Sequence, residues 1–354
     1  MAEVRTHLLR AGLDLLYASR LYRAFAPFWA GRGLIFMLHH IRPATKTQQN
    51  TSFQPNHILE ITPEFLSDVI NKVRMAGFDI LSMERAIERL QQPNTQPFAT
   101  FTLDDGYRDN IEHALPVFVK QNCPFTVFVT PKIIEGTCEL WWQALEKIIN
   151  AHEEISCRLG NEKISHKTVS ASDKQRAYKA IYWSMRFMDQ KAQREFIREL
   201  AEKYNLDLDE LCANQAMNWK QVRELQIHPL ATIGAHGVNH YALGLLSEAE
   251  AVLELEQSRT WIAEETGYEP DFFCYPYGDE KSARSRDFEL AKRAGYKAAV
   301  TTRKGLLFDG HSQHLSALPR VSLNGDYQAL KYIDLYLSGA PFALWNGFRK
   351  LNVA

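Results

Sequence analysis

The sequence predicts an α/β fold in which about seven parallel β/α units close into a distorted barrel. Two observations support this prediction. Short apolar runs alternate with amphipathic segments that begin at capping residues, the pattern of parallel strands joined by helices. The chain also has 354 residues, of which 45% are hydrophobic and 23% charged, enough to bury the core of such a barrel.

Seven runs rich in apolar and β-branched residues are expected to form the strands. They are LIFMLHHI (34–41), FATFTLDDG (98–106), PFTVFVT (124–130), PLATIGAH (229–236), DFFCYPYG (271–278), YKAAVTT (296–302) and ALPRVSL (317–323). Helices are expected between them, at a segment that starts at Pro63 and at 111–122, 247–267 and 285–295. For the first of these helices Thr62 is the expected N-cap and Gly77 the stop signal.

The alternation is interrupted between Cys138 and about Lys220. Three amphipathic segments, at 139–154, 172–188 and 190–205, follow one another there with little strand character. We therefore expect a barrel domain at 31–348 that is interrupted by a helical insertion at 138–220. Polar loops are expected at 44–57 and 303–314.

Residues 1–30 predict an amphipathic helix, in which leucines recur at helical spacing with arginines among them. Such a helix either packs on the domain surface or rests on an anionic membrane. The segment lacks the uninterrupted apolar region of a secretory signal, and no later run is long enough to span a bilayer. A cytoplasmic location, with membrane association as an option, is the resulting expectation.

The charge and the cysteine content argue against several classes of protein. The net charge of −1 provides no basic field, so nucleic-acid binding is not expected. The five cysteines are scattered and form no CxxC pair, which favours reduced thiols over a disulfide framework or a zinc ribbon.

Candidate site residues follow the predicted strands, at the carboxyl end of the barrel where active-site residues lie. Asp104 and Asp105 end the second run, and His236 and His240 follow the fourth. The two histidines would share a face if they lay on a helical turn. With one aspartate they would form a metal site of three protein ligands, which leaves the other aspartate as a general base.

The motifs around these residues resemble those of the NodB-type polysaccharide deacetylases, carbohydrate esterase family 4. FTLDDGYRDN resembles their TFDDG motif, HGVNH their H-S/T-x-x-H motif and CYPYG their R-x-P-Y-G motif, in the family's order over roughly residues 34–325. The resemblance implies that Asp104 is the base and that Asp105, His236 and His240 bind the metal. It also implies that the Tyr277 N–H stabilises the oxyanion, with Tyr275 and Pro276 next to the substrate.

Three departures from the family pattern affect the assignment. Cys274 replaces the arginine that orients the base, and Arg320 is the expected substitute, as in the branch of the family with YPYG and LPR motifs. Gly237 replaces the usual Ser/Thr. The Leu-His motif that carries the general acid is missing, so the acid is expected at His39 or His314, with His311 as a further candidate.

The resemblance implies metal-dependent hydrolysis of an amide bond, the removal of the acetyl group from an N-acetylamino sugar. Zinc is the expected ion, with cobalt, nickel or iron as alternatives. The substrate would be an N-acetylated saccharide, and Trp141 and Trp142 are candidates for stacking on it. Two other functions stay open: an amidohydrolase of the same fold acting on a cyclic amide or ureide, and a non-catalytic carbohydrate-binding protein.

Overall fold

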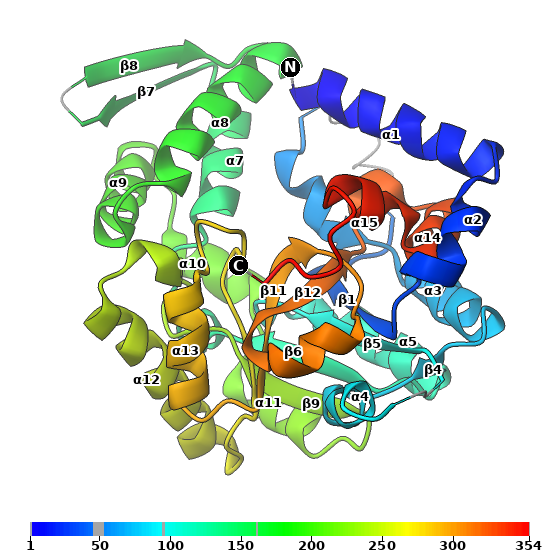
Figure 1. Ribbon diagram of the computed structural model, residues 1–354. Coiled ribbons are helices and arrows are strands. Elements are labelled where there is room, and N and C mark those ends of the chain that lie inside the picture. The colour runs from blue at the N-terminus through cyan, green and yellow to red at the C-terminus, as the bar shows by residue number, and fades with distance from the viewer. Residues whose placement is uncertain (1, 45–52, 94–95, 161, 354) are drawn as a thin grey trace.

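In the computed structural model, which describes residues 2–44, 53–93, 96–160 and 162–353, a closed parallel barrel lies at the centre with helices around it (Figure 1). Seven of the described strands form the closed ring. They are β1 (Gly33–Leu38), β5 (Phe98–Leu103), β6 (Phe125–Val129), β9 (Ala231–Ala235), β10 (Phe272–Cys274), β11 (Ala298–Lys304) and β12 (Leu318–Ser322). Each matches one of the seven predicted runs, so the predicted α/β barrel is confirmed.

The ring closes through β1, which pairs in parallel with β5 on one side and β12 on the other. Phe36 is the partner of Phe101 across the first pair and of Val321 across the second. A short strand, β4 (Asp79–Ile80), extends the sheet beside β5, and β2 (His40–Ile41) pairs with β3 (Glu60–Ile61) outside the ring. Every residue of β1, β5 and β6 is buried, as expected for parallel strands covered on both faces.

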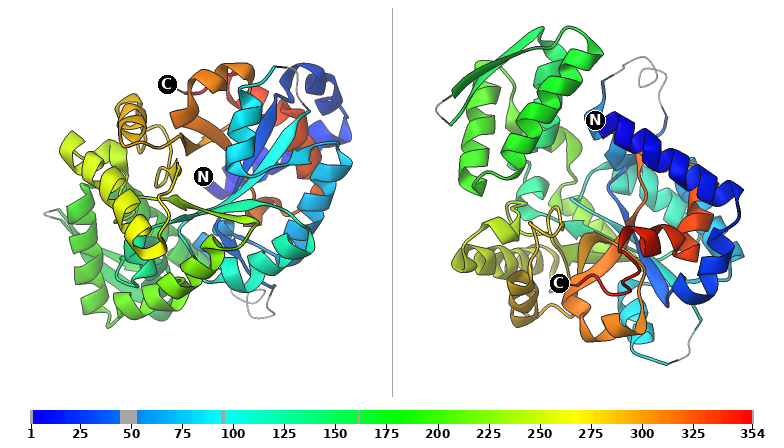
Figure 2. Two further views of the ribbon diagram at one scale, coloured as in Figure 1. Left: turned by 90° about the horizontal axis from the view of Figure 1, so that it is seen from below. Right: turned by 45° about the horizontal axis from the view of Figure 1, so that its top comes forward.

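Helices cover the outside of the barrel (Figure 2). They are α3 (Pro63–Met75), α4 (Met83–Leu90), α5 (Leu115–Lys120), α6 (Pro131–Ile134), α11 (Trp219–Gln226), α12 (Glu248–Thr266), α13 (Ser285–Arg293), α14 (Leu330–Ser338) and α15 (Ala340–Trp345). The Thr62 hydroxyl accepts a bond from the Phe65 N–H at the start of α3, as predicted. Ser247 and Glu250 form a capping box at the start of α12, and Gly267 ends it in the left-handed conformation that suits glycine.

The insertion forms a separate lobe at the upper left of Figure 1. It contains α7 (Trp141–Ala151), α8 (Ala171–Arg186), α9 (Gln190–Lys203) and α10 (Leu208–Gln215), and also a hairpin of β7 (Glu154–Leu159) and β8 (Glu162–Lys167). Our expectation of little strand character was wrong for this hairpin. Its signal is brief, since Ile155 and Cys157 of β7 alternate inward among polar neighbours. The lobe has its own buried cluster, which includes Trp141, Ile181 and Ile197.

The N-terminal segment is two helices rather than one. The helix α1 (Ala2–Ala18) ends before Arg20, whose φ of 59° is left-handed, and α2 (Tyr22–Trp29) follows. The predicted loop at 44–57 lies partly outside the described residues, and its later part begins a 3-10 turn at Pro55–Leu59. The other predicted loop begins with the last residues of β11 and continues through short 3-10 turns.

Candidate metal centre and active site

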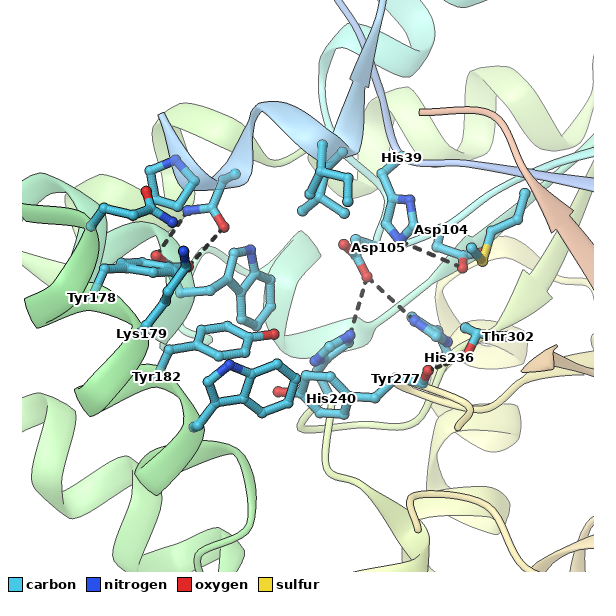
Figure 3. Close-up of a pocket in the computed structure, with 18 residues that line it drawn as sticks. His39, Asp104, Asp105, Tyr178, Lys179, Tyr182, His236, His240, Tyr277 and Thr302 are labelled. Atoms are coloured by element: carbon cyan, nitrogen blue, oxygen red, sulfur yellow. Dashed lines mark hydrogen bonds and ion pairs between the residues drawn. The ribbon is translucent and has the colours of Figure 1, made fainter. Parts of the chain in front are cut away.

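Asp104 and Asp105 follow β5 at the carboxyl end of the barrel, and their side chains lie in different surroundings (Figure 3). Both side chains are buried, with 2% and 3% of the surface of the two residues exposed. Asp105 has a φ of 75°, a conformation that costs an ordinary residue free energy and is concentrated at functional sites. The turn therefore directs one carboxylate toward β12 and the other toward the two histidines.

Asp104 is held by Arg320 of β12 through two parallel bonds. The Arg320 Nη1 and Nη2 atoms donate to Asp104 Oδ1 and Oδ2, each over 2.7 Å, and both residues are buried. Burial by itself would raise the pKa of Asp104, but the guanidinium outweighs it and the pKa lies below its ordinary value. Arg320 also donates to Cys274 Sγ over 3.1 Å, so this arginine lies beside the cysteine that replaces the family's arginine.

Asp105, His236 and His240 converge on one point. The Nε2 atoms of His236 and His240 lie 3.3 Å and 3.2 Å from Asp105 Oδ1. All three residues are buried. Burial would raise the pKa of Asp105, but the two imidazoles lower it well below its ordinary value, so this side chain is a carboxylate.

The chemistry of these three donors fits a divalent metal. A carbonyl oxygen only accepts hydrogen bonds, so His236 Nδ1, 2.6 Å from the Cys274 oxygen, carries the proton and its Nε2 presents a lone pair when the ring is neutral. Burial lowers the pKa of His240 to about 4, which keeps this ring neutral at pH 7. Asp105 Oδ1 has no hydrogen-bond partner within the described part of the chain. With both rings neutral and their protons on Nδ1, three donor atoms would present lone pairs to one point of a buried site, an arrangement that suits a cation between them.

A second group that could hold a metal, Asp104 with His236 and Cys274, is less suitable. Both oxygens of Asp104 are already engaged by Arg320. Burial raises the pKa of the Cys274 thiol, whereas a metal binds the thiolate. We therefore assign the metal to the group that contains Asp105.

The segment between the two histidines is not the helical turn that we expected. It is an irregular loop in which Gly237 has a φ of 72° and His240 a φ of 55°. Glu254 of α12 fixes this loop, because its Oε2 accepts bonds from the N–H groups of Val238 and Asn239 over 2.8 and 2.9 Å. A Cβ added at Gly237 would lie 2.9 Å from the same Glu254 oxygen. Glu254 therefore takes the space that a serine or threonine would need.

Tyr277 lies beside His240 and is fixed from both sides. Its φ is 62°, Thr302 donates to its carbonyl oxygen over 2.6 Å, and its ring centroid lies 4.8 Å from that of His240. From the insertion, Trp141 Nε1 donates to the Tyr277 hydroxyl over 2.7 Å. No described residue accepts a hydrogen bond from the Tyr277 N–H, which leaves that donor available.

Of the other predicted site residues, one lines the pocket and four do not. His39 lines the pocket, with its Nε2 atom 3.9 Å from Asp104 Oδ2. His314 is exposed in the turn that leads into the start of β12, which is the opposite end of the barrel, and His311 lies in the same connection. Tyr275 points into the core and donates to the Ser316 carbonyl, and neither it nor Pro276 lines the pocket. The structure therefore brings His39 to Asp104 but leaves His311, His314, Tyr275 and Pro276 outside the pocket.

A pocket of about 500 Å³ opens above the two aspartates, and the insertion forms one of its walls (Figure 3). The wall consists of Trp142 of α7 and, from α8, Gln175, Tyr178, Lys179, Tyr182 and Trp183. Sequence reasoning named Trp142 and missed the residues of α8. Their only signal is the spacing of Gln175, Tyr178, Lys179 and Tyr182, which places them on one side of a helix.

A parallel barrel whose carboxyl end holds two imidazoles and a carboxylate around one point is typical of metal-dependent hydrolases. The family model described as polysaccharide deacetylase matches residues 91–198 and 196–299, more than half of the chain. The chain belongs to this family, and its barrel matches those of solved deacetylase structures.

Among the similar solved structures are the following three, of which two are described as deacetylases. The Streptococcus pyogenes deacetylase PplD in complex with acetate is 16% identical, with a TM-score of 0.54 over 82% of this chain and 92% of that one. A de-N-acetylase from Aggregatibacter actinomycetemcomitans is 13% identical, with a TM-score of 0.54 over 86% and 99%. IcaB from Ammonifex degensii is 15% identical, with a TM-score of 0.53 over 88% and 99%.

Comparison with curated proteins gave no significant match. Among the helices of the described residues, none combines the length and hydropathy needed to cross a bilayer.

Proposed function

We propose that the protein is a NodB-type deacetylase of carbohydrate esterase family 4 that hydrolyses the acetamido group of an amino-sugar-containing glycan or glycan precursor. The observation that carries the proposal is the pair of adjacent aspartates in different surroundings. Asp105 faces the two imidazoles, while Asp104 is held as a carboxylate by Arg320 at the floor of the same pocket. The family membership supports the same reaction type.

In this proposal Asp105, His236 and His240 would hold a divalent metal, with zinc as the first candidate and cobalt, nickel or iron as alternatives. When bound, such an ion supplies Lewis-acid polarisation of a carbonyl and lowers the pKa of a water molecule.

The remaining roles belong to side chains of the pocket. Asp104 accepts a proton from the attacking water, and Arg320 holds this carboxylate in position and ionised. The free Tyr277 N–H donates to the oxyanion that develops on the acetyl carbonyl. Both groups act at the same end of the barrel, where Asp104 and Tyr277 line the pocket.

His39 is the best-placed group to protonate the leaving amine. Burial lowers its pKa, although the charge of Asp104 partly offsets this, so His39 is neutral at rest. A neutral imidazole 3.9 Å from Asp104 can receive the proton that the carboxylate took and pass it on. This role replaces the assignment of His314, which lies at the other end of the barrel.

The test is acetate release by the metal-loaded protein from N-acetylated saccharides, from monosaccharide to polymer. We expect release from at least one N-acetylhexosamine oligosaccharide, and no release after the metal has been removed. Cyclic amides and ureides are offered in parallel. Hydrolysis of these alone would indicate the cyclic-amide amidohydrolase, and saccharide binding without hydrolysis would indicate a binding protein.

A further inference from the structure

A second large cavity, of about 700 Å³, lies between α1 and the C-terminal helices, and apolar side chains line most of it. The residues that line it from α1 and the segment after it are Leu8, Leu9, Gly12, Leu13, Leu15, Leu16, Ser19 and Leu21; those at the C-terminal side include Tyr336, Phe342, Leu344 and Trp345. In Figure 1 α1 crosses the upper right of the molecule, with α15 below it. We call this cavity the α1 groove.

Helix α1 carries more apolar surface than the domain covers. Leu13, Leu16 and Tyr17 pack against the main core. Leu8 and Leu15 are 68% and 71% exposed, and their spacing of two helical turns places them in one stripe. A helix that only packed on the barrel would need a single apolar stripe, so the exposed leucines require another explanation.

The exposed apolar surface continues onto the end of the chain. Leu344, Trp345 and Phe348 are 53%, 47% and 57% exposed. The Phe348 ring lies 6.4 Å from that of Phe25 and 5.8 Å from that of Trp29, which joins this end to α2. Large contiguous patches of this kind mark interaction surfaces, whereas single exposed apolar side chains are ordinary.

Basic residues without neighbouring acids follow α1 and end the chain beside the α1 groove. Helix α1 carries two arginines and two acids, but residues 19–31 contain Arg20 and Arg23 and no acid, and residues 340–353 contain Arg349 and Lys350 and no acid. The whole chain, by contrast, has a net charge of −1. Arg20, Arg23, Arg349 and Lys350 are all exposed. An isologous dimer through this face would bring like charges together, so the charge favours an anionic partner over a second copy.

We propose that the α1 groove and its rim dock on an anionic membrane surface. Leu8, Leu15 and Trp345 enter the boundary between headgroups and acyl chains, and the exposed arginines lie against lipid phosphates. Apolar area and basic charge are the two contributions that hold an amphipathic helix at such a surface. Helices α1 and α15 supply the apolar area, and Arg20, Arg23, Arg349 and Lys350 supply the charge.

The α1 groove lies at the same end of the barrel as the pocket. It is lined by Lys304 and Ser322, the last residues of β11 and β12, and the pocket is lined by Thr302 of β11. Docking would therefore hold the pocket near glycans carried by the membrane. This consequence for the substrate rests on the proposed function, whereas the docking itself does not.

Co-sedimentation of the full chain with phospholipid vesicles tests the proposal. We expect at least tenfold stronger binding to vesicles that contain phosphatidylglycerol than to phosphatidylcholine alone, and weaker binding at high salt. The double variant Leu8→Gln with Leu15→Gln should bind about ten- to a hundredfold more weakly, since it removes two large apolar side chains from the interface. Leu253 and Ile227 are 50% and 84% exposed on other faces of the molecule. The matched control replaces both with Gln and should bind as the unchanged protein does.

Equal vesicle binding by the test and control variants overturns the proposal, as does an absence of binding by the unchanged protein. If light scattering then shows a dimer that the Leu8 and Leu15 substitutions dissociate, the groove holds a second copy instead. Thermal melting verifies that both variants fold. Acetate release from a soluble saccharide is measured separately, so vesicle binding by an inactive protein would contradict only the proposed function.

Discussion

The two walls of the pocket come from regions that differ in what they contribute. The barrel provides titratable groups, Asp104, Asp105 and His236, at the ends of strands that pair through their backbones. The insertion provides aromatic surface, including Tyr182 and Trp183, and its Arg194 donates bonds to the backbone carbonyl oxygens of Asn239 and His240. In the proposed function the barrel would therefore perform the chemistry, while the insertion would position the site and shape what can enter it.

The largest effect is expected at the barrel side, from Asp104→Asn. An amide cannot take a proton from water, so acetate release should fall by about 10²- to 10⁴-fold. The substitution also leaves Arg320 with a neutral partner, so melting and bound metal are measured on the same sample. Full activity in a folded, metal-loaded variant would remove Asp104 as the base.

Arg320→Met should have the next largest effect, mainly on stability. It leaves the Asp104 carboxylate buried without its cation, a change that costs about 3–5 kcal/mol for pairs of this type. In the unchanged protein the pKa of Asp104 lies below its ordinary value of 3.8, so this stabilisation is complete above that pH and is lost as the pH falls through the lower, folded-state pKa.

Denaturant unfolding as a function of pH checks this prediction. The variant should lose the acid-dependent part of the stability that the unchanged protein shows below about pH 4. An identical pH dependence in the two proteins would mean that the Arg320 pair does not set the ionisation of Asp104.

On the insertion side, Arg194→Met tests whether this lobe positions a metal ligand. Arg194 of α9 is 1% exposed and donates to the carbonyl oxygens of Glu139, Asn239 and His240. Losing these bonds should weaken metal affinity about ten- to a hundredfold, the usual effect of disturbing groups that orient a ligand. Arg194→Lys, which keeps the charge and some of the bonds, should recover part of it. Unchanged metal affinity in a destabilised variant would limit Arg194 to a structural role.

The smallest effect on activity is expected from the aromatic residues of the insertion that line the pocket. Trp183 is 57% exposed and lines the pocket, so Trp183→Ala should raise the KM for an oligosaccharide about three- to tenfold and leave kcat nearly unchanged. Leu253→Ala, at an exposed position on α12, is the control. A fall in kcat with no change in KM would assign Trp183 to the chemistry instead of to binding.

The same comparison explains what the sequence could predict. The strands were found because each is a short apolar run, and Asp104, Asp105 and the two histidines because they directly follow such runs at a known end of the barrel. The insertion lobe follows no such rule. The packing of the lobe around its own buried cluster decides which of its residues lie at the pocket. Neither Arg194 nor Tyr182 could therefore be placed beside the site from its position in the chain.

Two errors at the site have different physical causes. The helical turn expected between His236 and His240 is a loop, because Glu254, fourteen residues beyond His240, binds its N–H groups in place of helical carbonyls. His314 was a candidate acid because it precedes β12, but a residue that precedes a parallel strand lies at the end opposite to the site. The first error depends on a long-range contact, which local sequence patterns do not carry. The second could have been avoided, because the strand direction that placed Asp104 at the site places His314 at the other end.

The most direct test of the central claim, that the adjacent aspartates have different tasks, is equilibrium metal binding by three proteins measured alongside acetate release. The account predicts that the unchanged protein and Asp104→Asn both bind zinc or cobalt, that Asp105→Asn binds it far more weakly, and that only the unchanged protein releases acetate at its full rate. Loss of the metal in Asp104→Asn together with its retention in Asp105→Asn would contradict the account.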